Sequence, residues 1–263
     1  MPPANPLILY EEIYKCMDCA SAVSDESVRS FVQTGPGQTI PVSHFGDIRS
    51  SKIWLVSTNP KGNRHDSNVS YLPPGFVSRA ALRPDQVQQV FGHFSAYFNR
   101  QGYDSFFDRW IQILGGIELG GLSQTWQGGG ICCVDLIKCP TRADWRGVVR
   151  GPDKNLIYGC FRNSGSRKYL KRQIDLHDPR VLIFSASLGG PAYYAENNRS
   201  NLNSNLRRLW PADMKTNCTG IWTAGSPSRL SMGLTAEKTV RPDKIKNAIQ
   251  TVIRAWEATS HGV

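Results

Sequence analysis

The sequence lacks the features that mark membrane and secreted proteins. No apolar run in its 263 residues approaches the roughly 18 consecutive residues that a membrane-spanning helix needs. The first ten residues contain neither a basic stretch nor a long apolar stretch, so no secretion signal is visible. The seven cysteines are an odd number in a long chain, which does not suggest a secreted disulfide framework. We therefore expect an intracellular, cytoplasmic protein with no membrane partner. The sequence gives no sign of the oligomeric state, and a monomer is the default expectation.

Acidic residues are scarce as well. The chain has 31 Lys and Arg against 21 Asp and Glu, a net charge of +10. Ten basic residues and only two aspartates fall between Lys138 and Arg172, so this stretch alone carries +8. A polyanion neutralised by such a stretch releases counterions, and nucleic acid is the commonest partner of this kind. The alternative is a solvated basic face that binds no ligand.

Short apolar runs alternate with helical patterns along the chain. Four nearly continuous apolar runs predict strands that are covered on both faces, at residues 52–57, 131–137, 180–186 and 220–224. Helical spacing predicts helices that begin near Pro84 and Asp104, and others over residues 166–176 and 242–258. This alternation favours an α/β fold, a three-layer α/β/α arrangement with a central four-stranded, mainly parallel sheet. We expect residues 1–263 to form one domain, with a helical insertion within residues 64–130.

Polar residues follow three of the predicted strands. The first run ends at Ser57 and leads into Thr58-Asn59-Pro60, and the second contains Asp135 and leads into Lys138-Cys139-Pro140. The fourth leads into residues 225–231, which include Ser226 and Arg229. In open parallel sheets, ligands bind beyond the carboxyl ends of the strands. The sequence therefore predicts a ligand site at these turns, although Asn-Pro and Ser-Pro are also ordinary turn formers.

The cysteines divide into two groups. Cys132, Cys133 and Cys218 lie in or beside apolar runs and are expected to be small core residues. The other four are a close pair before the first strand and two single cysteines after the second, Cys16, Cys19, Cys139 and Cys160. An iron–sulfur cluster, a zinc site and unligated thiols are all compatible with this spacing. Structural zinc usually uses two close pairs, whereas one close pair with two scattered thiolates also occurs around iron–sulfur cubanes.

Taken in chain order, these motifs resemble a known family. The Cys pair, the Asn-Pro turn, the Lys-Cys-Pro strand end and the further single Cys are followed by residues 169–183 and by Ser226-Pro227-Ser228-Arg229-Leu230-Ser231. This order resembles the uracil-DNA glycosylase superfamily, and in particular its iron–sulfur branch, family four and its relatives. The resemblance spans roughly residues 15–231. It implies a uracil-DNA glycosylase-like fold and a monofunctional DNA repair enzyme that hydrolyses an N-glycosidic bond.

The resemblance also implies a cofactor. Cys16, Cys19, Cys139 and Cys160 would hold a 4Fe–4S cluster with a structural role. The cluster would fix the basic loop between the last two cysteines against DNA. Three arginines of that loop, Arg142, Arg146 and Arg150, are the expected phosphate contacts.

The same resemblance implies roles for residues at the turns. Asn59 would hold the catalytic water and Ser226 would stand in the second catalytic motif. The expected base-binding residues are Asp135, which would read the edge of the base, Tyr71, which would stack on it, and Ser57 and Thr58 beside it. Leu230 would enter the duplex as a wedge, and Ser228 and Arg229 would contact the DNA next to it.

Three positions depart from the family pattern. Thr58 stands where family four has a Glu, and Ser226 stands where many members have His or Asn. Asp135 stands where family four has the Asn that reads uracil. An ionised carboxylate accepts a hydrogen bond from uracil N3–H but repels the O4 oxygen. Three explanations stay open: Asp135 is protonated in a dry site, backbone groups read the base, or the base is not uracil.

The sequence thus predicts an intracellular, nucleoid-associated enzyme that flips uracil out of single- or double-stranded DNA and leaves an abasic site. One alternative is a glycosylase for another deaminated base such as hypoxanthine. Another is an iron–sulfur nucleic-acid-binding module on the same fold without catalytic activity. A zinc-bearing structural domain is the third.

Overall fold

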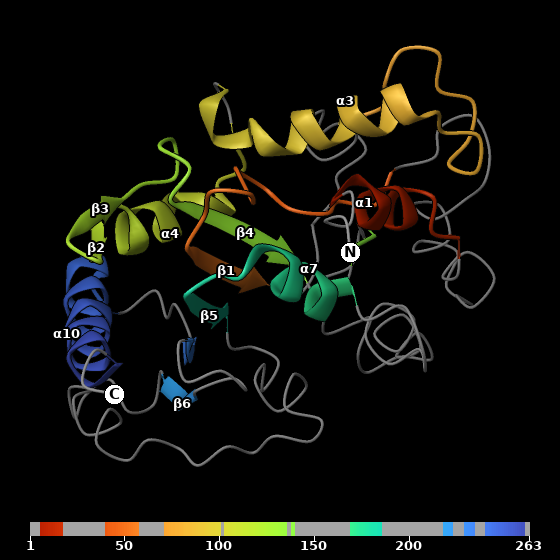
Figure 1. The fold of residues 1–263 in the computed structure, drawn as a ribbon. Helices are drawn as coiled ribbons and strands as arrows, with labels where there is room; N and C mark the ends of the chain where they lie inside the picture. The colour runs from red at the N-terminus through yellow and green to blue at the C-terminus, as the bar shows by residue number, and fades with distance from the viewer. Residues whose placement is uncertain are drawn as a thin grey trace, which may run out of the picture. The chain divides into compact units, whose positions relative to one another are not determined.

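The computed structural model describes residues 6–17, 40–57, 71–100, 103–135, 138–139, 169–185, 218–222, 229–234 and 240–260. Its central sheet has five strands in the order β4-β1-β5-β7-β6 (Figure 1). Their bounds are Ile53–Ser57 for β1, Ile131–Asp135 for β4, Val181–Ser185 for β5, Cys218–Trp222 for β6 and Leu230–Leu234 for β7.

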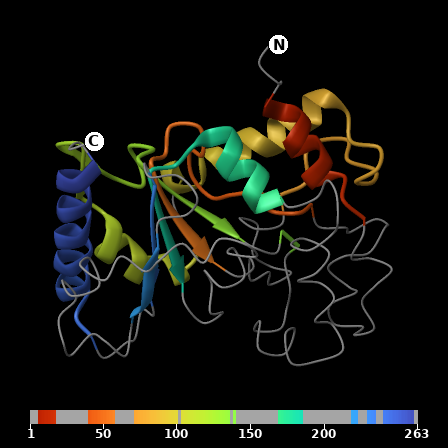
Figure 2. The same ribbon diagram turned by 60° about the horizontal axis from the view of Figure 1, so that its bottom comes forward.

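Most strands of this sheet are parallel. β1 pairs in parallel with β5, with Ile53 opposite Val181, and β5 pairs in parallel with β7. β4 and β1 point the same way in both ribbon views (Figure 1, Figure 2). Helices flank the sheet, which confirms the predicted α/β class with four parallel strands and is consistent with a three-layer α/β/α fold. The residues of β1, β4, β5 and β7 are almost all buried, as expected for a sheet covered on both faces.

The end of the sheet corrects one part of the prediction. The expected fourth strand corresponds to β6, which is antiparallel to β7 and lies at the edge of the sheet. The fourth parallel strand is instead β7, which starts at Leu230 inside the predicted second motif. Its apolar run is interrupted by Ser231 and Gly233, and for that reason it does not resemble the other buried strands in sequence.

Four of the five described α-helices correspond to helices that the sequence predicts. The helices are α1 at Pro6–Tyr14, α3 at Pro84–Ser95, α4 at Phe106–Leu114, α7 at Tyr169–His177 and α10 at Pro242–Ser260, with a short 3-10 helix, η1, at Tyr97–Asn99. Pro84 occupies the first turn of α3, and the side chain of Asp104 accepts a hydrogen bond from the Phe106 amide at the start of α4, at 2.7 Å. α1 was not predicted. Between α4 and β4 lies a small antiparallel hairpin of β2, Ile117–Leu119, and β3, Leu122–Gln124.

The chain divides into two compact units, each assembled from three segments. The first unit comprises Met1–Phe45, Ser57–Arg100 and Val134–His177. The second comprises Gly46–Val56, Gln101–Cys133 and Asp178–Val263.

Each unit has a core of its own kind. In the first, aromatic rings from α1, α3 and the chain before β1 pack edge to face, with Tyr10 and Phe91 at 4.6 Å between centroids. In the second, α10 packs on α4 and on β2, and Figure 2 shows α4 and α10 on the same side of β5. Over the described residues, no helix combines the length and the apolar character that a membrane span requires.

Candidate functional site

A buried pair of side chains joins the ends of two neighbouring strands. Ser57 is the last residue of β1 and Asp135 is the last residue of β4, and both belong to the first unit. The Ser57 hydroxyl donates a hydrogen bond to Oδ1 of Asp135. Asp135 is 1% exposed and Ser57 is 7% exposed. The structure therefore brings together two of the predicted base-binding residues, at the carboxyl ends of their strands, where parallel sheets bind ligands.

The second oxygen of Asp135 has no such partner among the described residues. Oδ2 is buried and makes no hydrogen bond to any residue that the structure describes. Burial raises the pKa of Asp135 to about 6, although the Ser57 hydrogen bond and the charge of Lys138 both act to lower it. Asp135 is therefore an acid whose protonation state changes near pH 6, and one of its oxygens bonds none of the described residues.

A buried lysine lies next to this pair. Lys138 is 1% exposed, and its Nζ donates to the backbone carbonyl of Asp135 at 2.5 Å and to that of Ser43 at 3.4 Å. Gln173 of α7 donates to the same Ser43 carbonyl at 3.1 Å. The sequence predicts Lys138 as one of the surface charges of the basic stretch, whereas the structure buries it. Its place three residues after a buried strand is the feature of the sequence that indicates burial.

Ser43 connects this site to a chain of hydroxyl and imidazole groups. Its Oγ lies 2.7 Å from the Tyr14 hydroxyl and 2.7 Å from Nδ1 of His44, and Nε2 of His44 lies 3.0 Å from the Ser95 hydroxyl. Burial raises the pKa of Tyr14, so its phenol stays neutral. Nothing in the sequence around residue 43 signalled this network, because its members come from segments far apart in the chain.

Two of the predicted cluster ligands meet at one arginine. Arg79 is fully buried, and its Nη1 donates to the Cys16 carbonyl at 3.1 Å and lies 3.9 Å from the sulfur of Cys139. Cys139 is buried and Cys16 is partly exposed. Among the described residues, no three or more metal-binding side chains form a group. Only two of the four predicted ligands, Cys16 and Cys139, are among the described residues. Cys132 and Cys133 are buried in β4, as predicted for core residues.

Tyr71 is occupied on one face of its ring. It stacks on His93 with 3.9 Å between centroids and 11° between the planes. His93 in turn contacts the Arg100 guanidinium, whose Nη1 lies 2.8 Å from Nδ1. The predicted stacking of Tyr71 on a base is thus confined to its other face, and it stays a prediction.

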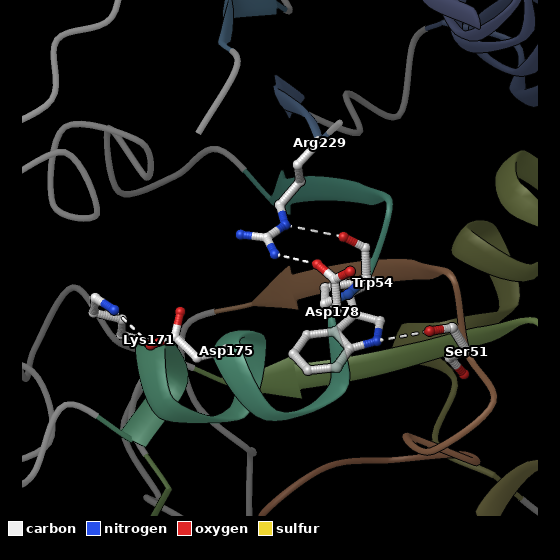
Figure 3. A network of polar contacts seen from close by, with 7 residues as sticks. Ser51, Trp54, Lys171, Asp175, Asp178 and Arg229 are labelled. Atoms are coloured by element: carbon white, nitrogen blue, oxygen red, sulfur yellow. Dashed lines mark hydrogen bonds and ion pairs between the residues drawn. The ribbon is translucent and has the colours of Figure 1, made fainter. Parts of the chain in front are cut away.

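Arg229 and Leu230 do not lie where the sequence prediction puts them. Leu230 is fully buried at the amino end of β7, opposite Val181. Arg229 donates from Nε to the Pro179 carbonyl at 3.0 Å and from Nη2 to Asp178 Oδ1 at 2.6 Å (Figure 3). A residue that wedges into DNA must be exposed, and ligands of parallel sheets bind at the other end of the strand. In this structure Leu230 is a core residue, and Arg229 bonds the two residues, Asp178 and Pro179, that come shortly before β5.

The remaining predicted site residues lie outside the described part of the chain. They are Thr58, Asn59, Ser226, Ser228, Arg142, Arg146, Arg150, Cys19 and Cys160. Their roles stay predictions. Neither models of known protein families nor the curated proteins give a match to this sequence. The case for a function therefore depends on the chemistry of the residues themselves.

Proposed function

We propose that this protein is a DNA glycosylase that flips uracil out of DNA and hydrolyses its N-glycosidic bond, leaving an abasic site. The observation that supports this most directly is the Ser57–Asp135 pair. It is a buried donor and acceptor at the carboxyl ends of adjacent strands, and one carboxyl oxygen has no partner among the described residues. Such a pair fits the edge of a nucleobase better than it fits a structural role, because an unsatisfied buried oxygen destabilises the fold.

The proposed reaction assigns a task to each residue. Cleavage builds positive charge on the sugar and negative charge on the departing base, so the enzyme must hold the base, stabilise the anion and place a water. Asp135 and Ser57 hold the base edge, and the face of Tyr71 that does not stack on His93 would stack on the base. Asn59 orients the water. Its amide cannot remove a proton efficiently, which suits a mainly dissociative transition state.

The described cysteines fit the proposed 4Fe–4S cluster. Four thiolates concentrate negative charge, and the buried guanidinium of Arg79 beside the Cys139 sulfur offsets part of it. Cys16, Cys19, Cys139 and Cys160 would hold the cluster, which would supply a structural cross-link rather than a reactive group. The loop that carries Arg142, Arg146 and Arg150 would then contact DNA phosphates.

A cleavage assay tests the activity. Single- and double-stranded oligonucleotides with one uracil are incubated with the protein and treated with alkali to break any abasic site. We expect a cut at the uracil, and loss of the cut in Asn59→Ala with DNA binding retained. Asn99→Ala is the matched control, because Asn99 is an exposed residue at the end of η1. Full activity in Asn59→Ala would contradict the site assignment.

Metal analysis tests the cofactor independently of activity. We expect about four iron and four sulfide per chain in the wild type, since a cubane contains four of each. Cys139→Ser should lose most of both. Cys132→Ser, a change of a buried cysteine in β4 that is not a proposed ligand, should keep them. Zinc in place of iron would contradict the proposal.

One observation favours a second candidate, a nucleic-acid-binding module without catalytic activity. Leu230 and Arg229 are buried, so the predicted wedge and its neighbour are not presented to DNA in this structure. A protein that binds DNA without a wedge need not flip a base. Salt-dependent DNA binding without release of uracil or hypoxanthine would establish this candidate instead.

A further inference from the structure

Asp135 stands where the resembled family has an Asn amide. Unlike that amide, a carboxyl group can ionise, and it then loses its hydrogen-bond donor. A neutral carboxylic acid offers one O–H donor and one carbonyl acceptor, the same pair that an Asn amide offers. A carboxylate offers only acceptors. Uracil presents a ring N3–H donor next to the O4 acceptor, so only the neutral acid matches both groups.

The structure distinguishes the two oxygens of this carboxyl group. Oδ1 accepts the hydrogen bond from the Ser57 hydroxyl, whereas Oδ2 has no partner among the described residues. An oxygen that already accepts a hydrogen bond is the poorer place for the acid proton. The Ser57 contact therefore favours the acid form in which Oδ2 carries the proton and Oδ1 is the carbonyl.

We propose that Asp135 reads the base as a neutral carboxylic acid, with Oδ2–H donating to the base carbonyl and Oδ1 accepting from the ring N–H, and that Ser57 fixes this assignment. The inference rests on the proposed function and states which bases the same site would accept. Uracil and hypoxanthine both carry the N–H and C=O pair. Cytosine carries the reverse pair, a ring acceptor beside an exocyclic amino donor, and it would need the proton on the other oxygen.

The charged and titratable surroundings are compatible with a neutral acid. Lys138 is the cation next to Asp135, and its Nζ bonds to two backbone carbonyls, those of Asp135 and Ser43. Tyr14 and His44 are the other titratable groups of the network, and both contact Ser43 rather than the carboxyl group. Burial is the largest influence on the pKa of Asp135 and favours the neutral form.

The proposal predicts a pH profile of a particular shape. Since burial raises the pKa of Asp135 to about 6, single-turnover excision of uracil should fall about tenfold for each pH unit above that value. Asp135→Asn cannot ionise, so its rate should stay level between pH 6 and 8. Ser57→Ala removes a hydrogen bond that lowers the pKa of Asp135, so the fall should begin at higher pH.

Base preference gives a second readout. Without Ser57 either oxygen can carry the proton, so Ser57→Ala should lose part of the preference for uracil over cytosine. The assay uses single-stranded oligonucleotides that differ only in the target base, because unpaired DNA removes the energy of opening the duplex. Circular dichroism confirms that each variant is folded.

The outcomes separate this inference from the function on which it rests. If the wild type releases uracil but Asp135→Asn keeps the wild-type slope, the inference is wrong and the glycosylase stands. If Ser57→Ala changes neither the profile nor the preference, Ser57 does not fix the proton. If neither the wild type nor the variants release uracil at any pH, the proposed function fails, and the inference with it.

Discussion

The two compact units place their polar groups differently. In the first, Asp135, Lys138 and Arg79 are each no more than 1% exposed. In the second, the ion pair between Glu118 and Arg254 leaves the two side chains 53% and 66% exposed. Burying a charge destabilises a fold unless the charge is paired and bonded, whereas an exposed pair changes stability little. Among the described residues, the first unit therefore carries the buried charged groups that a ligand would use, whereas the second has one buried charged residue, Arg229, and otherwise has the character of a scaffold.

The hairpin of the second unit illustrates the scaffold. The backbone amide and carbonyl of Glu118 both bond the side chain of Gln250 on α10, at 2.7 and 3.0 Å. One turn further along α10, Arg254 pairs with the Glu118 carboxylate at 2.7 Å. About one turn beyond that, Glu257 accepts a hydrogen bond from the Gly120 amide at 2.7 Å. The contacts repeat along one side of the helix and attach the hairpin to it. None of them buries a charge.

The largest expected effect is on the apolar core of the scaffold. Trp54 of β1 is fully buried, and its Nε1 donates to the Ser51 carbonyl at 3.3 Å (Figure 3). Trp54→Ala should lower the free energy of unfolding by about 3–5 kcal/mol, through lost burial and the cavity left behind. Urea unfolding followed by circular dichroism measures this. Leu122→Ala, at a leucine that is 69% exposed, is the control and should change it little.

Unlike Trp54→Ala, the substitution Asp135→Asn should raise the free energy of unfolding at pH 7. Burial raises the pKa of Asp135 from 3.8 to about 6, so the folded state binds more protons than the unfolded state between these values. The stability from this group is therefore complete below about pH 4 and is lost as pH rises through about 6, by about 3 kcal/mol. The Asn variant avoids that loss and should be the more stable protein at pH 7.

Urea unfolding at pH 4 and at pH 7 measures the difference. Asp243→Asn is the control in the second unit: Arg241 lowers the pKa of that exposed carboxyl, so the variant should not gain stability at pH 7. If Asp135→Asn is less stable than the wild type at pH 7, the carboxyl group has a structural partner that the present assignment lacks.

Arg229→Ala tests whether the buried arginine belongs to the scaffold. The change leaves the Pro179 carbonyl without its donor and removes the pair with Asp178, so we expect a loss of about 1–3 kcal/mol in the free energy of unfolding. DNA affinity, measured by fluorescence anisotropy, should stay unchanged. If Arg229→Ala reduces DNA affinity without reducing stability, Arg229 contacts DNA as the sequence predicts.

The smallest expected effect is at the exposed pair on the hairpin. Arg254→Ala should lower the free energy of unfolding by at most about 1 kcal/mol, because the pair with Glu118 is open to solvent. The difference should shrink further at high salt, where exposed charges are screened. A loss above 2 kcal/mol would mean that the hairpin and α10 depend on this contact far more than their exposure indicates.

The sequence predicts much of the fold because burial leaves a pattern along the chain. β1, β4 and β5 are nearly continuous apolar runs, and α3 and α10 repeat apolar residues at helical spacing. β7 is not predicted because Ser231 and Gly233 interrupt its apolar run. α1 is not predicted because two of its buried residues are tyrosines, Tyr10 and Tyr14, whose hydroxyls bond His177 and Ser43 far along the chain.

Only part of the candidate site is predictable for the same reason. Ser57 and Asp135 follow from the general rule that polar residues at the ends of parallel strands meet. Lys138 and Arg79 do not, since long charged side chains are normally exposed. Lys138 bonds the nearby Asp135 carbonyl, but both side chains also use acceptors at distant positions, the carbonyls of Ser43 and Cys16, and no local pattern records such a pairing.

The parallel register of β1 and β5 has a consequence for how the chain is made. Ile53 pairs with Val181, so the partner of β1 leaves the ribosome roughly 130 residues later, about ten seconds at ordinary rates of synthesis. Throughout that interval one edge of an apolar strand has its amides and carbonyls unpaired, a state that favours association with other chains. Until β5 emerges, a chaperone or a provisional contact within the nascent chain would lower the tendency of that edge to associate with other chains.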